Sequence, residues 1–318
     1  MQGTARHRAR PVAEVEPPLP ALTIPQLTYL VAVADAPSFA VAASSVGVTT
    51  SALSQGLAEL ERRIGVDLFE RSGRRQVLRP EGAEVLAYAR RVVADTGDLA
   101  RWAASLRSGE AGRLRVGMID AAALHHFPDV LRAFRDDHPA VDLRLSVGPS
   151  GELLDQLVRG ALDLAVVVDP PSAPAGLDLE PLVDEPLVVV APEGTPVAAI
   201  RDAGRWGPWV LFPEGSHTRS VIERELRARG AAVEVVAESH QPEVLREMAR
   251  LGVGWTVLPT SMLGSAGRVR SGSRMNRSKA PAEGPTLTTR HLVLARRANR
   301  LTSRVAESLV ADLTGASA

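Results

Sequence analysis

Short polar side chains gather on one side of a predicted helix in the segment "SVGVTTSALSQGLAELERRIG", residues 45–65. Helical spacing puts an apolar stripe on the opposite side: Leu53, Leu57, Leu60 and Ile64. Hydroxyl and amide groups donate and accept hydrogen bonds, and on such a helix they can reach base edges or phosphates in the major groove of DNA. The candidate DNA contacts on this helix are Thr49, Thr50, Ser51, Ser54 and Gln55.

A cluster of arginines follows this helix. No acidic residue occurs between positions 71 and 79, so the cluster is locally cationic, although the whole chain is balanced with 37 basic and 37 acidic residues. An isolated arginine cluster is more often a solvated surface than a binding site. Beside a polar helix face, however, it favours contacts with phosphates. The candidate phosphate contacts are Arg71, Arg74, Arg75 and Arg79.

The elements around these residues predict a helix-turn-helix with a wing. A short helix over "SFAVAASSV", capped by Ser38, is joined through Gly47 to the helix that Thr49 caps. A glycine turn and a leucine stripe occur in any pair of antiparallel helices, so they are weak signals alone. The run "DLFERSGRRQVLRPEG" adds a Ser-Gly turn between two short extended stretches, which predicts a two-stranded wing. Upstream, Thr23 is the expected N-cap of a first helix.

Composition bounds the class of protein. A chain of 318 residues with 45% hydrophobic content predicts two or three globular units. The absence of cysteine excludes disulfides, thiol nucleophiles and thiolate metal sites within these residues. No apolar run reaches the roughly 18 residues of a membrane span, and no apolar core follows the first arginines as in a signal peptide. We expect a disordered tail over residues 1–21 and a cytoplasmic protein without membrane contact.

After the glycine-rich hinge at residues 107–113 the pattern changes to alternating strands and helices. "RLRVGMI", "VDLRLSVG", "DLAVVV", "PLVVVAP", "WVLFP" and "HLVLARR" read as strands, with amphipathic helices between most of them. This alternation predicts an α/β fold with largely parallel sheets. Residues 264–288 are rich in Gly, Ser, Pro and Arg, and we expect them to form a long loop.

The sequence disfavours two functions other than DNA binding, that of a solute-binding protein and that of an enzyme. A solute-binding protein of the periplasmic type would need a secretion signal and has no use for a winged domain. An enzyme is not supported, because the chain lacks a P-loop, GxSxG, HExxH and a dinucleotide fingerprint. The glycines at 252 and 254 form only a lone GxG. We therefore expect neither catalytic residues, nor a metal site, nor a cofactor.

The stretch from "LTYLVAVADAPSFAVAA" through "LAELERRIGVDLFER" to "RPEG" resembles the winged helix-turn-helix of LysR-type transcriptional regulators. The resemblance implies a ligand-responsive regulator that binds operator DNA as a homodimer or homotetramer and acts on RNA polymerase. It implies an N-terminal, all-α winged helix-turn-helix (22–80), a dimerising linker helix (81–108) and an effector-binding α/β domain (113–318). That domain would form two lobes similar to type 2 periplasmic binding proteins: lobe I (113–185 and 289–318) and lobe II (186–265), with a flexible loop at 266–288.

In this family a small effector binds between the lobes, and open α/β sheets place ligands at the carboxyl ends of strands. The expected effector contacts in this sequence are Ile119, Asp120, Ala121, Ser150, Asp169, Ser216, His217, Thr218 and Glu238. Several of these also have a simpler interpretation, because Ser150, Ser216 and Thr218 could cap helices. Many relatives have Ser or Thr near the position of Asp120, where it meets an acidic group of the ligand. An aspartate there suggests a ligand with a donor or a positive charge, or equally a helix cap that faces solvent. For His125 and His126 we favour a surface role.

The helix that Thr49 caps departs from the family pattern at two neighbouring positions, and the segment after the wing departs at one. Many members carry Arg or Lys at the position of Gln55 and a polar residue at that of Gly56, and many have Thr where Arg79 stands. Glycine inside a helix costs roughly 0.5–1 kcal/mol relative to alanine. Gly56 is interpreted either as tolerated drift, which we favour, or as a close approach to DNA.

Overall fold

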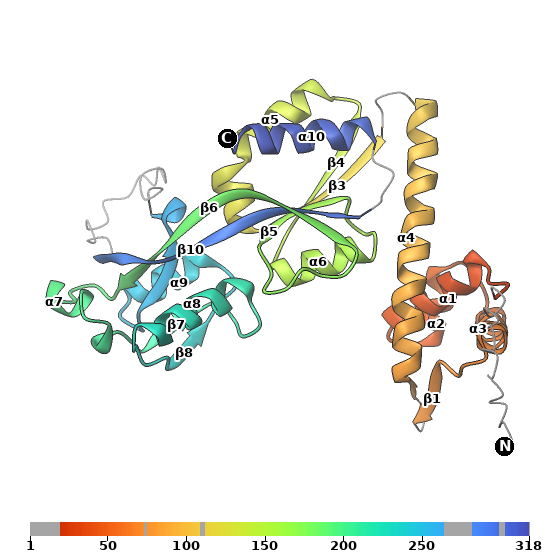
Figure 1. Ribbon diagram of the computed structural model, residues 1–318, viewed down its shortest axis with the longest axis horizontal. Coiled ribbons are helices and arrows are strands. Elements are labelled where there is room, and N and C mark those ends of the chain that lie inside the picture. Colours follow the sequence, from red (N-terminus) through yellow and green to blue (C-terminus); the bar gives the residue numbers. More distant parts are fainter. Residues whose placement is uncertain (1–19, 73–74, 109–111, 264–281, 299–302, 318) are drawn as a thin grey trace, which may run out of the picture. The chain divides into compact units, whose positions relative to one another are not determined.

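A computed structural model describes residues 20–72, 75–108, 112–263, 282–298 and 303–317. Contacts divide the chain into two compact units, Met1–Val93 and Ala94–Ala318. Helix α4 (Pro80–Ser108) belongs to both, since it begins in the first unit and ends in the second (Figure 1). Most of the expected N-terminal tail, residues 73–74 of the expected wing turn and much of the expected long loop lie outside the described residues.

The first unit is a bundle of helices followed by a small antiparallel hairpin. Its elements before α4 are α1 (Ile24–Asp35), α2 (Phe39–Ser45), α3 (Thr50–Ile64), β1 (Phe69–Ser72) and β2 (Arg75–Leu78). Thr23 and Gln26 form a capping box at the start of α1, and Ser38 caps α2. The Thr49 hydroxyl accepts the Ala52 N–H at 3.2 Å, so α3 begins where the sequence predicted.

The apolar face of α3 packs against two different helices. Leu53 packs on Ala42 and Ala43 of α2. Leu57 and Leu60 lie in another cluster with residues of α1 and α4: Leu27, Leu30, Leu86 and Ala89. α2 is only 7 residues long and covers only the first turns of α3. Because the rest of the apolar stripe packs on α1 and α4, the polar face of α3 points away from the unit's core.

Gly56 lies under the ring of Tyr29. A Cβ atom at this position would be 2.5 Å from Cδ2 and 2.7 Å from Cε2 of that ring. Carbon atoms do not approach so closely, so the ring occupies the space that a side chain would need. Neither drift nor contact with DNA is needed to explain this glycine, because it lets α1 and α3 pack closely.

The second unit contains a mixed six-stranded sheet in the order β4-β3-β5-β10-β6-β9. Its strands are β3 (Gly112–Met118), β4 (Val141–Val147), β5 (Leu164–Val168), β6 (Leu177–Ala191), β9 (Thr256–Pro259) and β10 (Ala282–Arg297). Within this six-stranded sheet only the pairs of β3 with β4 and β5 are parallel. β10 is antiparallel to β5 and β6, and β6 is antiparallel to β9. The prediction of a largely parallel sheet is therefore wrong for this half, because the chain leaves along β6 and returns along β10.

Two hydrophobic cores divide this unit into two lobes. Lobe I is built on Leu114, Val116 and Phe134 together with one half of each long strand, and lobe II on Trp209, Ile222 and Leu258 with the other halves. On β6 the change of core falls between Leu182 and Leu187. This stretch contains Glu185, the residue at which the first part of lobe I was expected to end. The expected loop at 264–288 is wrong for residues 282–288, which belong to β10.

Helices and short strands complete both lobes (Figure 1). Lobe I carries the π-helical turn η1 (Ala122–His126), α5 (Pro128–Asp137), α6 (Ser150–Val158) and α10 (Arg304–Gly315). α10 lies beside α5, and α6 packs on β5 and β10. Lobe II carries α7 (Val197–Ile200), η2 (Ala203–Arg205), β7 (Trp209–Leu211), α8 (His217–Ala228), β8 (Val235–Glu238), α9 (Pro242–Arg250) and η3 (Thr260–Met262).

Buried ion pairs attach the C-terminal part of α4 to lobe I. Asp98 is 2% exposed and accepts hydrogen bonds from Arg101 and from Arg297 of β10. Arg101 also lies 3.8 Å from Asp163, which in turn binds the guanidinium of Arg115 at 2.8 Å. Because a buried charge needs a partner, these pairs fix the end of α4 on the sheet.

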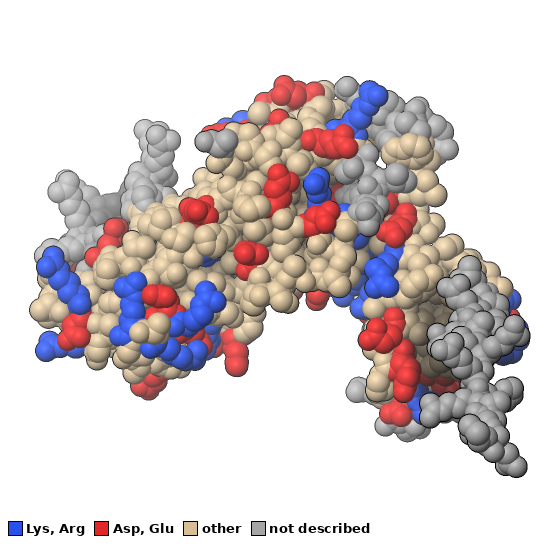
Figure 2. Space-filling model, in the orientation of Figure 1, with Lys and Arg blue, Asp and Glu red and all other residues tan. Residues whose placement is uncertain are grey.

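Charged side chains of both signs are interspersed on the surface over lobe II (Figure 2). On α8 they form ion pairs one turn apart, such as Arg227 with Glu223 at 2.6 Å and Arg229 with Glu225 at 3.1 Å. Pairs of this kind on a helix surface stabilise it modestly. None of the helices within the described ranges has the length and apolar character that a membrane span requires.

Candidate DNA-binding face and ligand pocket

The polar residues at the start of α3 form an exposed face. Thr49, Thr50, Ser51, Ser54 and Gln55 are all exposed, while Leu53 between them is buried. Thr49 uses its hydroxyl oxygen as the N-cap, and the other side chains have no hydrogen-bond partner among the described residues. They are therefore available to donate to or accept from an external partner.

The arginines at the far end of α3 are already paired within the helix. Arg62 and Arg63 both bind Glu59, at 2.6 and 2.5 Å. Hydrogen bonds from these two guanidinium groups lower the pKa of Glu59 to about 2. This end of the helix is thus locally neutralised, in contrast to its hydroxyl-rich start.

The predicted phosphate contacts belong to the wing and to the residue after it. Arg71 is in β1 and Arg75 is in β2, whereas Arg74 lies outside the described residues. Arg79 directly precedes α4 and is 3.4 Å from Asp67, with both side chains exposed. A contact this long and this exposed leaves Arg79 able to bind another anion.

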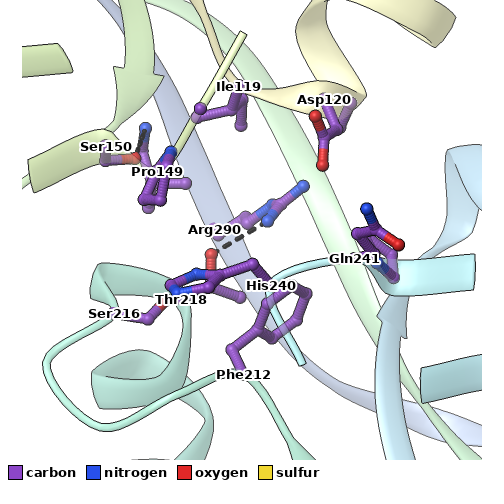
Figure 3. A pocket seen from close by; sticks show the side chains of 14 residues that line it. Ile119, Asp120, Pro149, Ser150, Phe212, Ser216, Thr218, His240, Gln241 and Arg290 are labelled. Atoms are coloured by element: carbon purple, nitrogen blue, oxygen red, sulfur yellow. Dashed lines mark hydrogen bonds between the residues drawn. The ribbon is translucent and has the colours of Figure 1, made fainter. Parts of the chain in front are cut away.

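A pocket of about 210 Å³ lies between the two lobes (Figure 3). Lobe I contributes the segments that follow β3 and β4 and the last residue of β5, and lobe II contributes the start of α8 and the segment before α9. β10 supplies one charged side chain, Arg290. The residues that line it are Ile119, Asp120, Ala121, Gly148, Pro149, Ser150, Val168, Phe212, Ser216, Thr218, His240, Gln241, Pro242 and Arg290.

Most of the effector contacts expected from the sequence line this pocket: Ile119, Asp120, Ala121, Ser150, Ser216 and Thr218. Three others do not. Asp169 is exposed beyond the end of β5. The His217 ring faces the Val168 carbonyl at 3.3 Å, and the Glu238 carboxylate accepts from Arg219. Their side chains are therefore directed to other partners or to solvent.

Arg290, which lines the pocket, belongs to a buried ion pair between the two crossing strands, and we call this pair the pocket floor. Glu185 of β6 and Arg290 of β10 are direct partners in the antiparallel register, and they are 1% and 4% exposed. The guanidinium donates to the same Glu185 oxygen through Nε at 2.8 Å and Nη2 at 2.6 Å. Its Nη1 donates to the Thr218 hydroxyl at 2.9 Å (Figure 3). The charges of the pair compensate each other in a place with little access to water.

Glu185 is held from both lobes. Its other carboxylate oxygen lies 2.8 Å from Nε2 of His126 in lobe I and accepts from the Ser261 hydroxyl in lobe II. Burial raises the pKa of Glu185, but the hydrogen bond to His126, the charge of Arg290 and the hydrogen bond to Ser261 outweigh it and lower the pKa to about 2. The surface role expected for His126 is therefore wrong, because its ring is part of this network.

The sequence did not reveal Arg290, Glu185, Phe212, His240 or Gln241 as parts of this site. Arg290 and Glu185 are 105 positions apart, and only the pairing of β6 with β10 brings them together. One signal was available, since an acidic residue directly precedes the predicted strand "PLVVVAP" and a basic residue directly precedes "HLVLARR". Within the described residues, no three His, Asp or Glu side chains gather as they would around a metal ion.

Comparisons with known proteins agree over nearly the whole chain. The family model described as "LysR substrate binding domain" matches residues 107–317, and "Bacterial regulatory helix-turn-helix protein, lysR family" matches residues 24–83. The chain is 33% identical over 303 residues to a "Probable hydrogen peroxide-inducible genes activator" of Streptomyces viridosporus, covering 92% of this chain and 93% of that protein.

Solved structures share the fold. A full-length OxyR variant from Pseudomonas aeruginosa matches with a TM-score of 0.65 and 25% identity, covering 93% of this chain and 94% of that one. Full-length CbnR complexed with its target DNA matches with a TM-score of 0.55 and 20% identity, covering 93% and 99%. The predicted fold class, a helical N-terminal domain followed by an α/β region, is confirmed. These relatives are regulators rather than enzymes.

Proposed function

The chain belongs to the LysR family of DNA-binding transcriptional regulators, and we propose how it reads DNA and where it senses its effector. The start of α3 enters the major groove of operator DNA, and a small molecule binds in the pocket between the two lobes. The observation that carries the first part is the exposed, unpartnered polar face formed by Thr50, Ser51, Ser54 and Gln55. Side chains of this length can hydrogen-bond to base edges.

The wing supplies the electrostatic part of the contact. Arg71 belongs to β1 and Arg75 to β2, Arg74 precedes Arg75 in the sequence, and Arg79 follows β2. Each arginine that neutralises a phosphate releases counterions, which makes binding sensitive to salt without adding sequence preference. Sequence preference therefore comes from the contacts of α3 with bases, and most of the salt-dependent affinity comes from the contacts of the wing with phosphates.

Two copies of the chain act together, as a homodimer or homotetramer that contacts RNA polymerase in the cytoplasm. Helix α4 supports this assembly because its described part exposes three large apolar side chains, Tyr88, Leu99 and Trp102. Exposed apolar residues on a long helix are typical of a surface that another protein covers. Two recognition helices related by a two-fold axis would then meet two half-sites of a pseudo-palindromic operator.

The signal is a bound molecule rather than oxidation of a thiol. A relative carries the name of a hydrogen peroxide-inducible genes activator, but none of the 318 residues of this chain is cysteine. Peroxide has no thiol to oxidise here, and no disulfide can form. A ligand that prefers one arrangement of the lobes shifts the population toward that arrangement, and this is how the effector would change DNA binding.

A titration of the full chain with fluorescent DNA tests this function. The expected result is binding to the DNA upstream of its own gene that is tighter than to a scrambled duplex and weakens steeply as salt increases. Equal binding to both duplexes at every salt concentration would contradict it.

A further inference from the structure

Two buried hydroxyl groups in the pocket have a proton to donate and no acceptor for it among the described residues. Ser150 and Thr218 are 7% and 5% exposed. The Ser150 oxygen accepts the Val168 N–H at 3.1 Å, and the Thr218 oxygen accepts from Arg290 at 2.9 Å. Since an N–H group occupies one lone pair of each oxygen, each hydroxyl is left to act as a donor. A buried donor without an acceptor is costly, so a ligand oxygen in this place would be stabilised.

Both hydroxyls lie in the first turn of a helix that points into the pocket. Ser150 begins α6, which has 9 residues, and Thr218 is the second residue of α8, which has 12. Neither helix has a side-chain hydrogen bond at its N-cap. The free N–H groups and the helix dipole favour negative charge at such an end. Helix geometry and hydroxyl chemistry therefore indicate the same occupant, an anionic oxygen.

The opposite side of the pocket has the reverse character. Figure 3 shows the Asp120 carboxylate across the cavity from Ser150 and Ser216. Within the described residues, this carboxylate has no hydrogen bond and no ion pair, and it is the one acidic residue among those that line the pocket. Burial and the nearby charge of Glu243 raise the pKa of Asp120, whereas His240 lowers it. A cation or strong donor beside it would supply the missing partner.

We propose that the effector is a small zwitterion, with its anionic group at Ser150 and Thr218 and its protonated amine at Asp120. A simple carboxylate would satisfy the hydroxyls but would be repelled by Asp120. A simple amine would pair with Asp120 but would leave the buried donors empty. The cavity of about 210 Å³ is smaller than the roughly 300–1,000 Å³ typical of drug-sized ligands, which fits a metabolite of amino-acid size.

This inference rests on the proposed function only in using the same pocket, and it is tested without DNA. Amino acids are titrated against the full chain by calorimetry and by thermal shift. Each is compared with its N-acetyl derivative, which lacks the cation, and with its methyl ester, which lacks the anion. We expect at least one amino acid to raise the melting temperature, and both of its derivatives to bind roughly tenfold or more weakly.

Asp120→Asn and Asp169→Asn form a matched pair of variants. Asp169 follows the neighbouring strand β5 but does not line the pocket, and Asp120 has no described contact whose removal would unfold the protein. We expect Asp120→Asn to weaken the amino acid about tenfold or more and to leave its N-acetyl derivative unchanged or tighter. Asp169→Asn should leave both affinities as in the wild type.

Two outcomes would overturn the proposal: no amino acid binds, or the N-acetyl derivatives bind as well as the parent compounds. Neither would remove the regulator function, because the DNA titration measures that separately. A monoanion that binds the wild type and no longer binds Thr218→Val would show that the pocket is real and that the zwitterion is the wrong class.

Discussion

The polar face of α3 and the pocket between the lobes both present hydroxyl and amide side chains, but the two are assembled differently. The residues of the α3 face lie within one helix, Thr50–Ile64, and its own cap and leucine stripe orient them. The pocket joins residues from Ile119 to Arg290, and the pairing of two long strands brings them together. A change on the α3 face should therefore have local effects, whereas a change in the pocket floor should affect the fold of both lobes.

The largest effect is expected from removing the anion of the pocket floor. Glu185→Ala leaves Arg290 buried without its partner, which typically costs about 3–5 kcal/mol. Urea unfolding followed by tryptophan fluorescence reports this selectively, because Trp102, Trp206, Trp209 and Trp255 all belong to residues 94–318.

Glu59→Ala is the control for this change. This variant likewise removes a carboxylate that pairs with arginine, here with Arg62 and Arg63. These residues lie on the exposed surface of α3, in the other unit. We expect no shift in the tryptophan transition. If Glu185→Ala shifted it no more than Glu59→Ala does, the pocket floor would not hold the lobes.

Lowering the pH should remove a related contribution, on the order of 3 kcal/mol, from the free energy of unfolding. The pKa of Glu185 is lowered from 4.5 to about 2 in the folded chain, so the ionised form stabilises the fold. This contribution is complete above pH 4.5 and is lost as the pH falls toward 2. The free energies of unfolding of the wild type and of Glu185→Gln, measured as a function of pH, should therefore converge as the pH falls below 4.5. Parallel curves would mean that another group dominates acid unfolding.

The same difference between the regions decided what could be predicted from sequence. The bounds, cap and exposed face of α3 followed from residues a few positions apart, and so did the strand ends that carry Asp120 and Ser150. The pairing of Glu185 with Arg290 did not, because it depends on the register of two strands far apart in the chain. His217 was misplaced for a related reason: helix position alone does not tell which way a side chain turns.

The α3 region also depends on one contact that sequence spacing does not show, that between Gly56 and the ring of Tyr29. Gly56→Ala improves helix propensity by roughly 0.5–1 kcal/mol, but it forces the Tyr29 ring to move, and overpacking costs about 1–3 kcal/mol. We expect a net destabilisation of about 1 kcal/mol, measured by circular dichroism during thermal unfolding.

Two comparisons isolate this contact. Gly151→Ala in α6 has open space around the new methyl group and should be neutral or stabilising. In a Tyr29→Ala background, Gly56→Ala should change from destabilising to stabilising. An identical effect of Gly56→Ala in both backgrounds would show that the ring does not impose the glycine.

The most direct test compares two double variants in DNA titrations over a range of salt concentrations. Ser54→Ala with Gln55→Ala should reduce the preference for the operator over a scrambled duplex, by about 1–3 kcal/mol for each base that is no longer recognised, and leave the salt dependence unchanged. Arg74→Ala with Arg75→Ala should weaken binding to both duplexes and reduce the slope of log K against log salt by about 2. If the α3 variant kept the full preference for the operator, the central claim that α3 reads the sequence would be contradicted.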